Sequence, residues 1–424
     1  MTLNNDAWQK LFERYHILDE IRSHGEYIIS ANQIKTVREP RLMVKFDHKV
    51  NLPSIFQENN LAILPISRGD YVISSFFAYN EFEDFDAPLH QISIPQHLQS
   101  LMPKYLISET IALNCAYACN VLADFLEDDD LTSTVNGRMS SGNFSFQINT
   151  AYGSKCIAVR NAQIEIDAAY EGVQYLSLFE AKRDISKDFL IRQLYYPFRA
   201  WSNRVTKPVK SIFLVFSNGV FYLKEYRFAD PKNYNSLFLV KQINYKIETH
   251  IFWSDIENLL KNTSIECEPD FPFPQADSMS RIINLFELLY NKPRAKQEIT
   301  TIYDFNERQT GYYVDAGRYL GIIEKQRNEN GQICFQLSPL GQHIMALEYQ
   351  KRQLSIVEQI LKHHVFNKAL KIYLQCGEMP SKQTIIQIMK EYDLYHVKAD
   401  STYQRRSATV MSWINWILSI VDKS

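Results

Sequence analysis

The sequence predicts a mixed α/β core followed by a mainly helical C-terminal region. Three observations lead to this prediction. Apolar and polar residues alternate at the period of a β-strand in two neighbouring runs, residues 163–167 and 176–182. Two further strand-like runs flank an Asn-Gly dipeptide at residues 218–219, which is a strong hairpin signal. After a proline-rich stretch at residues 268–277, apolar residues recur at helical spacing.

Length and composition limit the class of protein. The chain has 424 residues, too many for one compact core, so we expect several structural units. Its formal net charge is −2, so any surface that binds nucleic acid has to be local. The six cysteines form no CxxC pair, which argues against a disulfide framework and favours a reducing, cytoplasmic compartment. We expect no membrane partner, because we find neither a signal segment nor an apolar run of transmembrane length.

Residues 1–100 are expected to form an N-terminal α/β region. Residues 6–22 have helical periodicity, and residues 69–78 are strand-like. Two segments rich in cations, residues 38–45 and 65–71, are candidates for contact with a phosphate backbone. The alternative for both segments is an ordinary basic surface.

Residues 101–267 contain the alternating runs and are expected to form the α/β core. A helix is predicted over residues 108–125, and the acidic run after it, residues 127–130, is interpreted as its solvated end. Residues 136–143 are predicted to be a loop of small polar residues in which Arg138 could pair with a phosphate, although a plain turn is the alternative. A helix over residues 188–204 and strands over residues 210–216 and 219–226 follow.

The two alternating runs place charged residues on one face of each strand. Glu165 and Asp167 share a face of the first strand, and Glu180 and Lys182 share a face of the second. The apolar faces consist of Ile164, Ile166, Phe179 and Ala181. If these apolar faces share a core, three carboxylates and one ammonium converge on one patch. Carboxylates this close repel one another unless a hard cation such as Mg²⁺ neutralises them. The alternative is a solvated hairpin face with alternating charges.

Asp167 and the run Glu180-Ala181-Lys182 resemble the PD-(D/E)XK motif, the metal site shared by many type II restriction endonucleases. Ile166 stands where that family often has a proline. The resemblance implies a restriction-endonuclease-like core with an αβββαβ mixed sheet. It also implies that Asp167 and Glu180 bind Mg²⁺ and that Lys182 orients or activates the attacking water. Accessory roles near the metal are implied for Glu165, Glu109 and Gln193.

Residues 268–279 are predicted to be an extended linker, because prolines prevent helix and discourage sheet. Residues 280–350 resemble a winged helix, with helices over residues 280–290, 295–302 and 306–320 and a hairpin wing around residues 330–331. In DNA-binding winged helices the third helix reads the major groove. The resemblance therefore implies DNA contacts by Asn306, Arg308, Gln309, Tyr312, Tyr313 and Arg318. A protein-interaction module is the alternative.

Residues 351–424 are predicted to be a second helical module that resembles part of a winged helix. They contain eleven lysines and arginines against six aspartates and glutamates, a local excess of five positive charges. Arg405 and Arg406 begin the last predicted helix and are candidates for contact with phosphates. Solvated surface is the alternative for these two arginines.

The combination predicts a sequence-specific, Mg²⁺-dependent endonuclease of double-stranded DNA, that is, a type II site-specific deoxyribonuclease of a restriction-modification system. A cognate DNA methyltransferase is then expected in the same system. A homodimer on DNA is expected because two strand cuts usually call for two active sites. Two alternatives stay open: another nuclease of the same superfamily that serves repair or mobile-element defence, and a non-enzymatic winged-helix regulator whose acidic hairpin is only structural.

Overall fold

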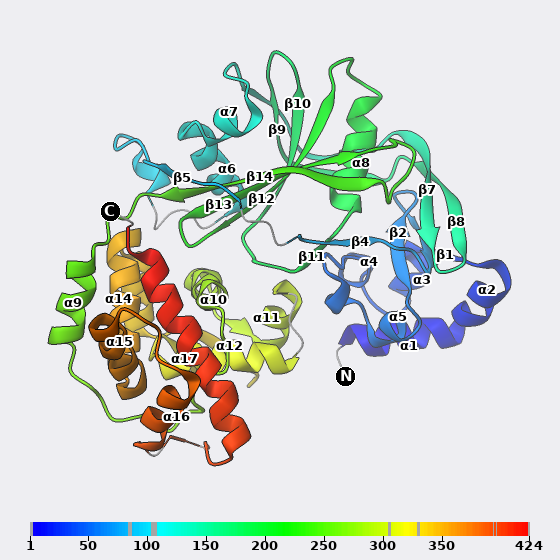
Figure 1. The fold of residues 1–424 in the computed structure, drawn as a ribbon. Helices are drawn as coiled ribbons and strands as arrows, with labels where there is room; N and C mark the ends of the chain where they lie inside the picture. The colour runs from blue at the N-terminus through cyan, green and yellow to red at the C-terminus, as the bar shows by residue number, and fades with distance from the viewer. Residues whose placement is uncertain are drawn as a thin grey trace.

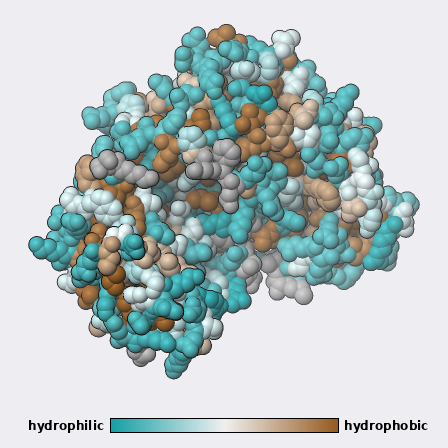
Figure 2. All heavy atoms as spheres, viewed as in Figure 1, coloured by the Kyte–Doolittle hydropathy of each residue, from teal (hydrophilic) through white to brown (hydrophobic). Residues whose placement is uncertain are grey.

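The computed structural model describes residues 3–83, 87–102, 108–303, 307–328, 331–392, 394–395 and 397–422. Figure 1 shows a sheet-bearing central body, with the N-terminal elements on one side below it and the C-terminal helices on the other. In the described residues no helix is long and apolar enough to cross a membrane. On the face shown in Figure 2, hydrophobic side chains are scattered among hydrophilic ones.

The N-terminal body has a core of its own, which includes Trp8, Phe56 and Ile73. Trp8 donates a hydrogen bond from Nε1 to the backbone oxygen of Met43, 2.9 Å away. The strands form an antiparallel sheet in the order β1-β3-β2. The elements are α1 (Leu3–Arg14), α2 (Ile17–His24), β1 (Tyr27–Ser30), α3 (Ala31–Lys35), α4 (Pro40–Met43), η1 (Lys49–Asn51), α5 (Ser54–Glu58), β2 (Ala62–Pro65) and β3 (Asp70–Ser74). The helix expected over residues 6–22 is divided at His16, whose φ of 49° is left-handed.

The central body is organised around a mixed sheet of seven strands in the order β5-β14-β13-β12-β10-β9-β6. The pairs β10–β12 and β14–β5 are parallel, and the other neighbours are antiparallel. The strands are β5 (Leu89–Ile92), β6 (Thr132–Ser140), β9 (Gln163–Glu171), β10 (Leu176–Lys182), β12 (Val209–Ser217), β13 (Val220–Phe228) and β14 (Leu237–Ile247). β5 lies before the boundary expected at residue 100. The central sheet therefore includes a strand from the first hundred residues, which were expected to form a separate region.

Helices cover both faces of this sheet. α6 (Glu109–Ala118) and α7 (Val121–Leu126) pack on one face, where Phe125 and Leu214 belong to the same core. α8 (Arg192–Ser202) packs on the other face, where Leu194 and Phe213 belong to the same core. Because adjacent residues of β12 point into opposite cores, this strand is apolar on both faces. The mixed α/β class expected from the sequence is therefore confirmed.

The apolar faces of β9 and β10 do not share one core, contrary to the expectation. Ile164 and Ile166 pack on the side of α8, whereas Phe179 and Ala181 pack on the side of α6 and α7. The cause is a bulge in β9. Gly137 pairs with Ile166 but Val135 pairs with Ala169, so β9 has one extra residue between these two pairs. The bulge falls at Asp167, where it changes which residues face each side.

Some expected local structures are wrong because long-range pairing overrides them. The segment expected as a loop, residues 136–143, is strand up to Ser140, since β6 pairs with β9 and places Arg138 opposite Glu165. The helix expected over residues 188–204 begins at Arg192, because the preceding residues form β11 (Asp188–Leu190), which pairs with β4 (Tyr79–Glu81).

Two further predictions concern the local backbone conformation. The helix expected over residues 108–125 is divided at Asn120, which has a φ of 59°. The hairpin predicted at Asn218-Gly219 is confirmed, with both residues at positive φ.

The remaining elements of the central body lie beside the sheet. A second hairpin, formed by β7 (Asn143–Thr150) and β8 (Gly153–Arg160), packs Phe146 against Tyr195 and Tyr196 of α8. A short helix, η2 (Gln99–Leu101), precedes α6. After β14 the chain leaves the central body, and α9 (Trp253–Asn262) packs into the C-terminal core through Ile256 and Leu260.

The C-terminal region begins with a helix, a short strand, two helices and a hairpin, followed by five helices. The sheet order is β15-β17-β16. The elements are α10 (Met279–Asn291), β15 (Arg294–Ala295), α11 (Lys296–Ile302), α12 (Glu307–Tyr319), β16 (Ile323–Arg327), β17 (Ile333–Leu337), α13 (Pro339–Ala346), α14 (Tyr349–Leu361), α15 (His364–Cys376), α16 (Lys382–Lys390) and α17 (Asp400–Ile420). Within residues 351–424, the described part contains no strand.

One continuous core joins the two C-terminal modules that the sequence suggested. It contains Phe286 of α10, Ile356 of α14 and Trp413 of α17. Gly317 of α12 lies close to this core, because a Cβ atom there would be 2.4 Å from Cδ1 of Ile323. These contacts make the region from α10 to α17 one packed unit rather than two separate ones.

Candidate active site

The residues of the resembled motif meet where β9 and β10 pair. The two strands are antiparallel, with Ala168 opposite Phe179. Asp167 accepts a hydrogen bond at Oδ2 from the backbone nitrogen of Ala181, 2.8 Å away, which ties its carboxylate to the next strand. The ammonium of Lys182 lies 2.5 Å from Oε1 of Glu180. Asp167, Glu180 and Lys182 therefore lie together at one end of the hairpin.

A buried carboxylate fixes the turn that joins these strands. Asp128, which is 8% exposed, accepts hydrogen bonds from the backbone nitrogens of Val173 and Gln174 at 3.3 and 3.2 Å. A Cβ atom on Gly172 would be 2.0 Å from Oδ2 of Asp128, so only glycine fits there with the carboxylate in place. The interpretation of residues 127–130 as a solvated helix end is thus wrong for Asp128. This residue holds the hairpin that carries the site.

Glu180 is largely withdrawn from water, and its side chain is 11% exposed. Burial raises the pKa of Glu180 to about 7, and the negative charge of Asp167 adds to this effect while Lys182 opposes it. Burial also acts against the charge of Lys182, but the carboxylates of Glu180, Asp47, Glu109 and Asp167 outweigh it and raise the pKa of Lys182 above its ordinary value. The ammonium therefore stays charged at neutral pH and partly compensates a surplus of carboxylates.

Two of the three accessory residues lie near this group. Gln193 of α8 donates a hydrogen bond from Nε2 to Oε1 of Glu180 at 2.7 Å. Glu109, in the first turn of α6, has a pKa raised by burial, with Lys182 and Asp167 among its electrostatic neighbours. Glu165 is more than half exposed and pairs with Arg138 across β6 and β9 at 3.3 Å. The pairing makes Glu165 and Arg138 an edge-strand ion pair beside the site.

A small cavity of about 10 Å³ borders Glu180, Gln193 and Leu194. This volume is close to the minimum that holds one water molecule. Oε1 of Gln193 is buried and accepts no hydrogen bond from the described residues. The site thus contains polar groups whose hydrogen-bonding capacity is not used within the described part of the chain.

The N-terminal body contributes two residues that the sequence did not reveal, Asp47 and His48. The backbone oxygen of Asp47 accepts a hydrogen bond from the nitrogen of Leu190 at 3.0 Å. Burial acts to raise the pKa of the Asp47 carboxyl, but nearby cations, Lys182 first among them, bring it below its ordinary value. Oδ1 of Asp47 is buried and has no hydrogen-bond partner among the described residues. The only nearby feature noted in the sequence was the basic run that ends at Lys45. A basic run gives no reason to expect a carboxylate of the active site at the next positions.

The donor set fits a hard divalent cation in its chemistry, because carboxylate oxygens are the ligands that Mg²⁺ prefers. Buried carboxylates beside one another also carry unfavourable charge that a cation relieves. Among the described residues, no group of three histidine, cysteine, aspartate or glutamate side chains is arranged to hold a metal ion. A cation at this site would therefore have at most Asp167 and Glu180 as the predicted protein ligands, and water or substrate oxygens would supply the others.

The predicted DNA-contacting residues in and next to α12 differ in their exposure. Asn306 lies outside the described residues. Arg308 is exposed and donates a hydrogen bond from Nε to the hydroxyl of Tyr312. Gln309 is partly exposed. Tyr313, which we expected on the surface, is buried in the C-terminal core, and this burial raises its pKa.

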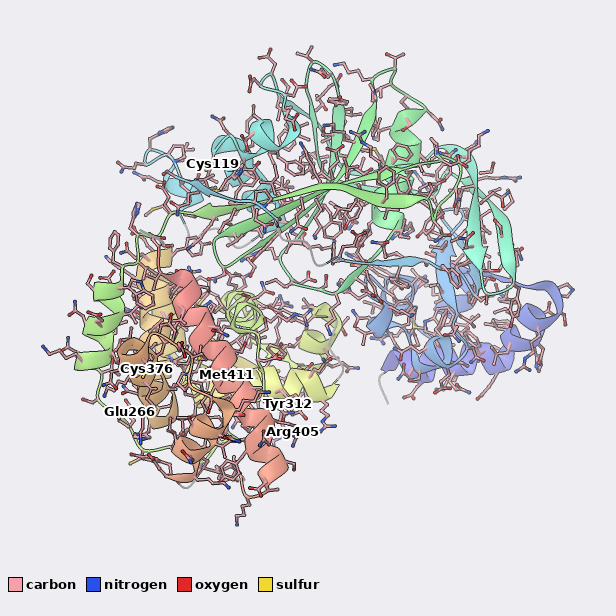
Figure 3. The ribbon with its side chains drawn as sticks, in the orientation of Figure 1. Cys119, Glu266, Tyr312, Cys376, Arg405 and Met411 are labelled. Atoms are coloured by element: carbon pink, nitrogen blue, oxygen red, sulfur yellow. The ribbon has the colours of Figure 1, made fainter. Side chains whose placement is uncertain are left out.

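The other predicted DNA contacts lie at the edge of the same region. Arg318 is not freely exposed either, because it pairs with Asp315 at 3.2 Å and covers the ring of Phe271. Arg405 is exposed at the start of α17, and Figure 3 shows it at the same end of the C-terminal region as Tyr312. The pKa of Arg406 is lowered by burial and by the adjacent Arg405.

Comparison with known proteins finds three protein families, which match successive parts of the chain. Residues 5–73 match a domain of unknown function (DUF6996), residues 74–246 match another (DUF6997), and residues 281–422 match a third (DUF7226). The first boundary falls at the end of β3, before β4 and β5 join the central body. No curated protein and no solved structure matches the chain.

Proposed function

We propose that this protein is a Mg²⁺-dependent endonuclease of double-stranded DNA, with its active site at Asp167, Glu180 and Lys182. The observation that carries the proposal is the meeting of these three groups at one end of the β9–β10 hairpin. Lys182 touches Glu180, and Asp167 is tied to the strand between them. A buried glutamate beside a second carboxylate and an ammonium costs folding free energy, and such clusters are typical of functional sites.

The topology supports the same proposal. Strands β6, β9 and β10 are consecutive antiparallel neighbours, and β12 then pairs parallel to β10 after the intervening helix α8. With α6 and α7 in front, this gives the order αβββαβ, into which the hairpin β7–β8 is inserted. That order is the one implied by the resemblance to the PD-(D/E)XK nucleases. The C-terminal order of helix, strand, helix, helix and hairpin likewise supports a winged-helix reader of DNA.

In the proposed mechanism Asp167 and Glu180 would hold Mg²⁺, which would supply charge stabilisation and a more acidic water at the phosphate. Lys182, kept charged by the surrounding acids, orients the attacking water. Gln193 fixes the carboxylate of Glu180 through its amide. Glu109 adds negative charge from the start of α6, and Glu165 stays paired with Arg138 outside the reacting groups.

The partners proposed with this activity are double-stranded DNA, a cognate methyltransferase and a second copy of the chain on DNA. The side chains of Arg308, Arg405 and Arg406 would contact the phosphate backbone. Such contacts position a protein on DNA but do not read the base sequence. Base readout would come from the exposed part of α12. A cytoplasmic location and membership of a restriction-modification system complete the proposal.

The test is digestion of a sequenced, unmodified plasmid with and without Mg²⁺, using the wild-type protein and two matched variants. Glu180→Gln should lower cleavage by about a hundredfold or more, the order seen when one group that stabilises developing charge is lost. Glu171→Gln, at the turn end of the same hairpin, where Glu171 pairs with Lys207, should cut at nearly the wild-type rate. Both variants should retain DNA binding, because phosphate and base contacts lie elsewhere.

The cleavage pattern separates the alternatives. Discrete fragments support restriction, and cleavage without fixed ends favours another nuclease of the superfamily. DNA binding by a wild-type protein that cuts nothing with Mg²⁺ would favour the regulator. Undiminished cutting by Glu180→Gln would eliminate the site.

A further inference from the structure

The loop directly after Lys182 is where the three parts of the chain meet. We call residues 183–187 the junction loop. It connects β10, which ends at Lys182, to β11, which begins at Asp188, and it has no regular secondary structure. Such a segment holds its position only through contacts made from outside it.

The N-terminal body holds the far end of the loop through His48, which is 3% exposed. Nε2 of His48 lies 3.3 Å from Oδ2 of Asp184. Its Nδ1 donates to the backbone oxygen of Asp188 at 2.8 Å and lies 3.2 Å from the carboxylate of the same residue. The backbone nitrogen of Lys49 also donates to the Asp188 carboxylate, at 3.1 Å. One imidazole therefore joins the inside of the junction loop to the start of β11.

The C-terminal region holds the near end through Asn284 of α10, which is 2% exposed. Its Nδ2 donates to the backbone oxygen of Arg183, and its Oδ1 accepts from the backbone nitrogen of Ile185 at 3.4 Å. The amide is anchored from behind by Oγ of Ser217, 2.8 Å from Nδ2. Asn284 thus satisfies a donor and an acceptor of the loop backbone, much as a neighbouring strand would.

The position of this loop bears on the site because Arg183 follows Lys182 with no intervening residue. Fixing the carbonyl of Arg183 fixes the direction in which β10 ends, and so the direction of the Lys182 side chain. The ammonium has to lie within hydrogen-bond distance of Glu180. A displacement of about 1 Å in such a group can reduce catalysis on the order of a hundredfold.

We propose that His48 and Asn284 are positioning residues for the reaction, which together clamp the junction loop and set Lys182 against Glu180. This inference rests on the proposed nuclease function. It means that both flanking regions, not the central body alone, complete the active site, although neither of these two side chains touches the reacting groups.

The test uses the full-length protein and two variants with matched controls. Asn284→Ala and His48→Gln remove the clamp from either side. Asn51→Ala is the control for the first, because Asn51 also joins the N-terminal and C-terminal regions, through the backbone oxygen of Thr301. No hydrogen bond from Asn51 to the junction loop is found among the described residues. His90→Gln is the control for the second, because His90 pairs with Asp124 away from the site. Single-turnover cleavage, DNA affinity and amide hydrogen exchange are measured for each.

Each clamp variant should lower the cleavage rate by about tenfold or more while the DNA dissociation constant stays within about twofold. Exchange should rise at residues 181–187 and stay unchanged in the seven-stranded sheet. The controls should match the wild type in all three measurements. This split distinguishes positioning from general destabilisation, which would alter affinity and exchange throughout.

The proposal is overturned if the clamp variants cut at the wild-type rate, if their controls lose as much activity, or if exchange in the junction loop does not change. A wild-type protein that cuts no DNA would overturn the proposed function instead. The exchange measurement needs no activity, so it would still decide whether the two residues hold the loop.

Discussion

Asp128 offers a direct test of how the hairpin is held, by the substitution Asp128→Ala. The substitution removes two hydrogen bonds to the backbone nitrogens of Val173 and Gln174, at 3.3 and 3.2 Å. Hydrogen bonds to charged groups contribute about 1.5–3 kcal/mol, and less at long distances. Taking about 1 kcal/mol for each long bond gives a loss of about 2 kcal/mol in the free energy of unfolding. Asp129→Ala, at the exposed neighbouring position, should change it by less than about 0.5 kcal/mol.

The assay is urea unfolding, monitored both by far-ultraviolet circular dichroism and by tryptophan fluorescence. The two signals together are meant to detect the unfolding of the separate cores. We expect the midpoint that reports on the central body to fall for Asp128→Ala alone. Because the turn carries β9 and β10, Mg²⁺-dependent cleavage should fall with it. Equal midpoints for the two variants would refute the conclusion that this carboxylate organises the turn.

Three further predictions concern packing, DNA contact and pH. Gly317→Ala should destabilise the protein by about 1–2 kcal/mol, because overpacking outweighs the gain in helix propensity. Gly311→Ala, on the same helix but with room for a Cβ atom, should stabilise the protein by about 0.5–1 kcal/mol. Thermal unfolding measures both changes. Arg405→Ala should weaken binding of all DNA sequences alike and reduce the salt dependence of the logarithm of affinity by about 0.9, measured by fluorescence anisotropy from 50 to about 200 mM salt. Burial opposes the charge of His48, but its two aspartate partners raise its pKa to about 10. Its stabilising contribution should therefore be complete below about pH 6.5 and be lost as pH rises through about 10, a decline that unfolding midpoints should show in the wild type and not in His48→Gln.

Features encoded by neighbouring residues could be predicted from the sequence. The Asn218-Gly219 turn is one example, because the two residues tolerate the positive φ that a two-residue hairpin needs. The proximity of Asp167 to Glu180 is another, since a short connection makes adjacent strands pair. Gln193 lies beside Glu180 because α8 follows the same strand and packs back on the sheet.

Features that depend on distant partners could not be predicted. The strand at Arg138 exists because β6 meets β9, and the bulge at Asp167 is visible only in that pairing. His48 reaches the site across about 140 positions of sequence, with nothing local to indicate its partners. The same limit explains Tyr313, whose place on α12 fits an exposed face until the neighbouring helices cover it.

The shared core of the C-terminal region determines how its specificity could be exchanged. Phe286, Ile356 and Trp413 belong to one apolar interior, so a cut near residue 350 would leave two exposed halves. A chimaera that transplants only the part around α12 would inherit mismatched surfaces and fold poorly. The transferable piece is the whole span from α9 to α17, because Ile256 and Leu260 of α9 belong to the same core. Within it, the donor chain would have to supply an asparagine at the position of Asn284 in α10, to keep the recipient's catalytic loop in position.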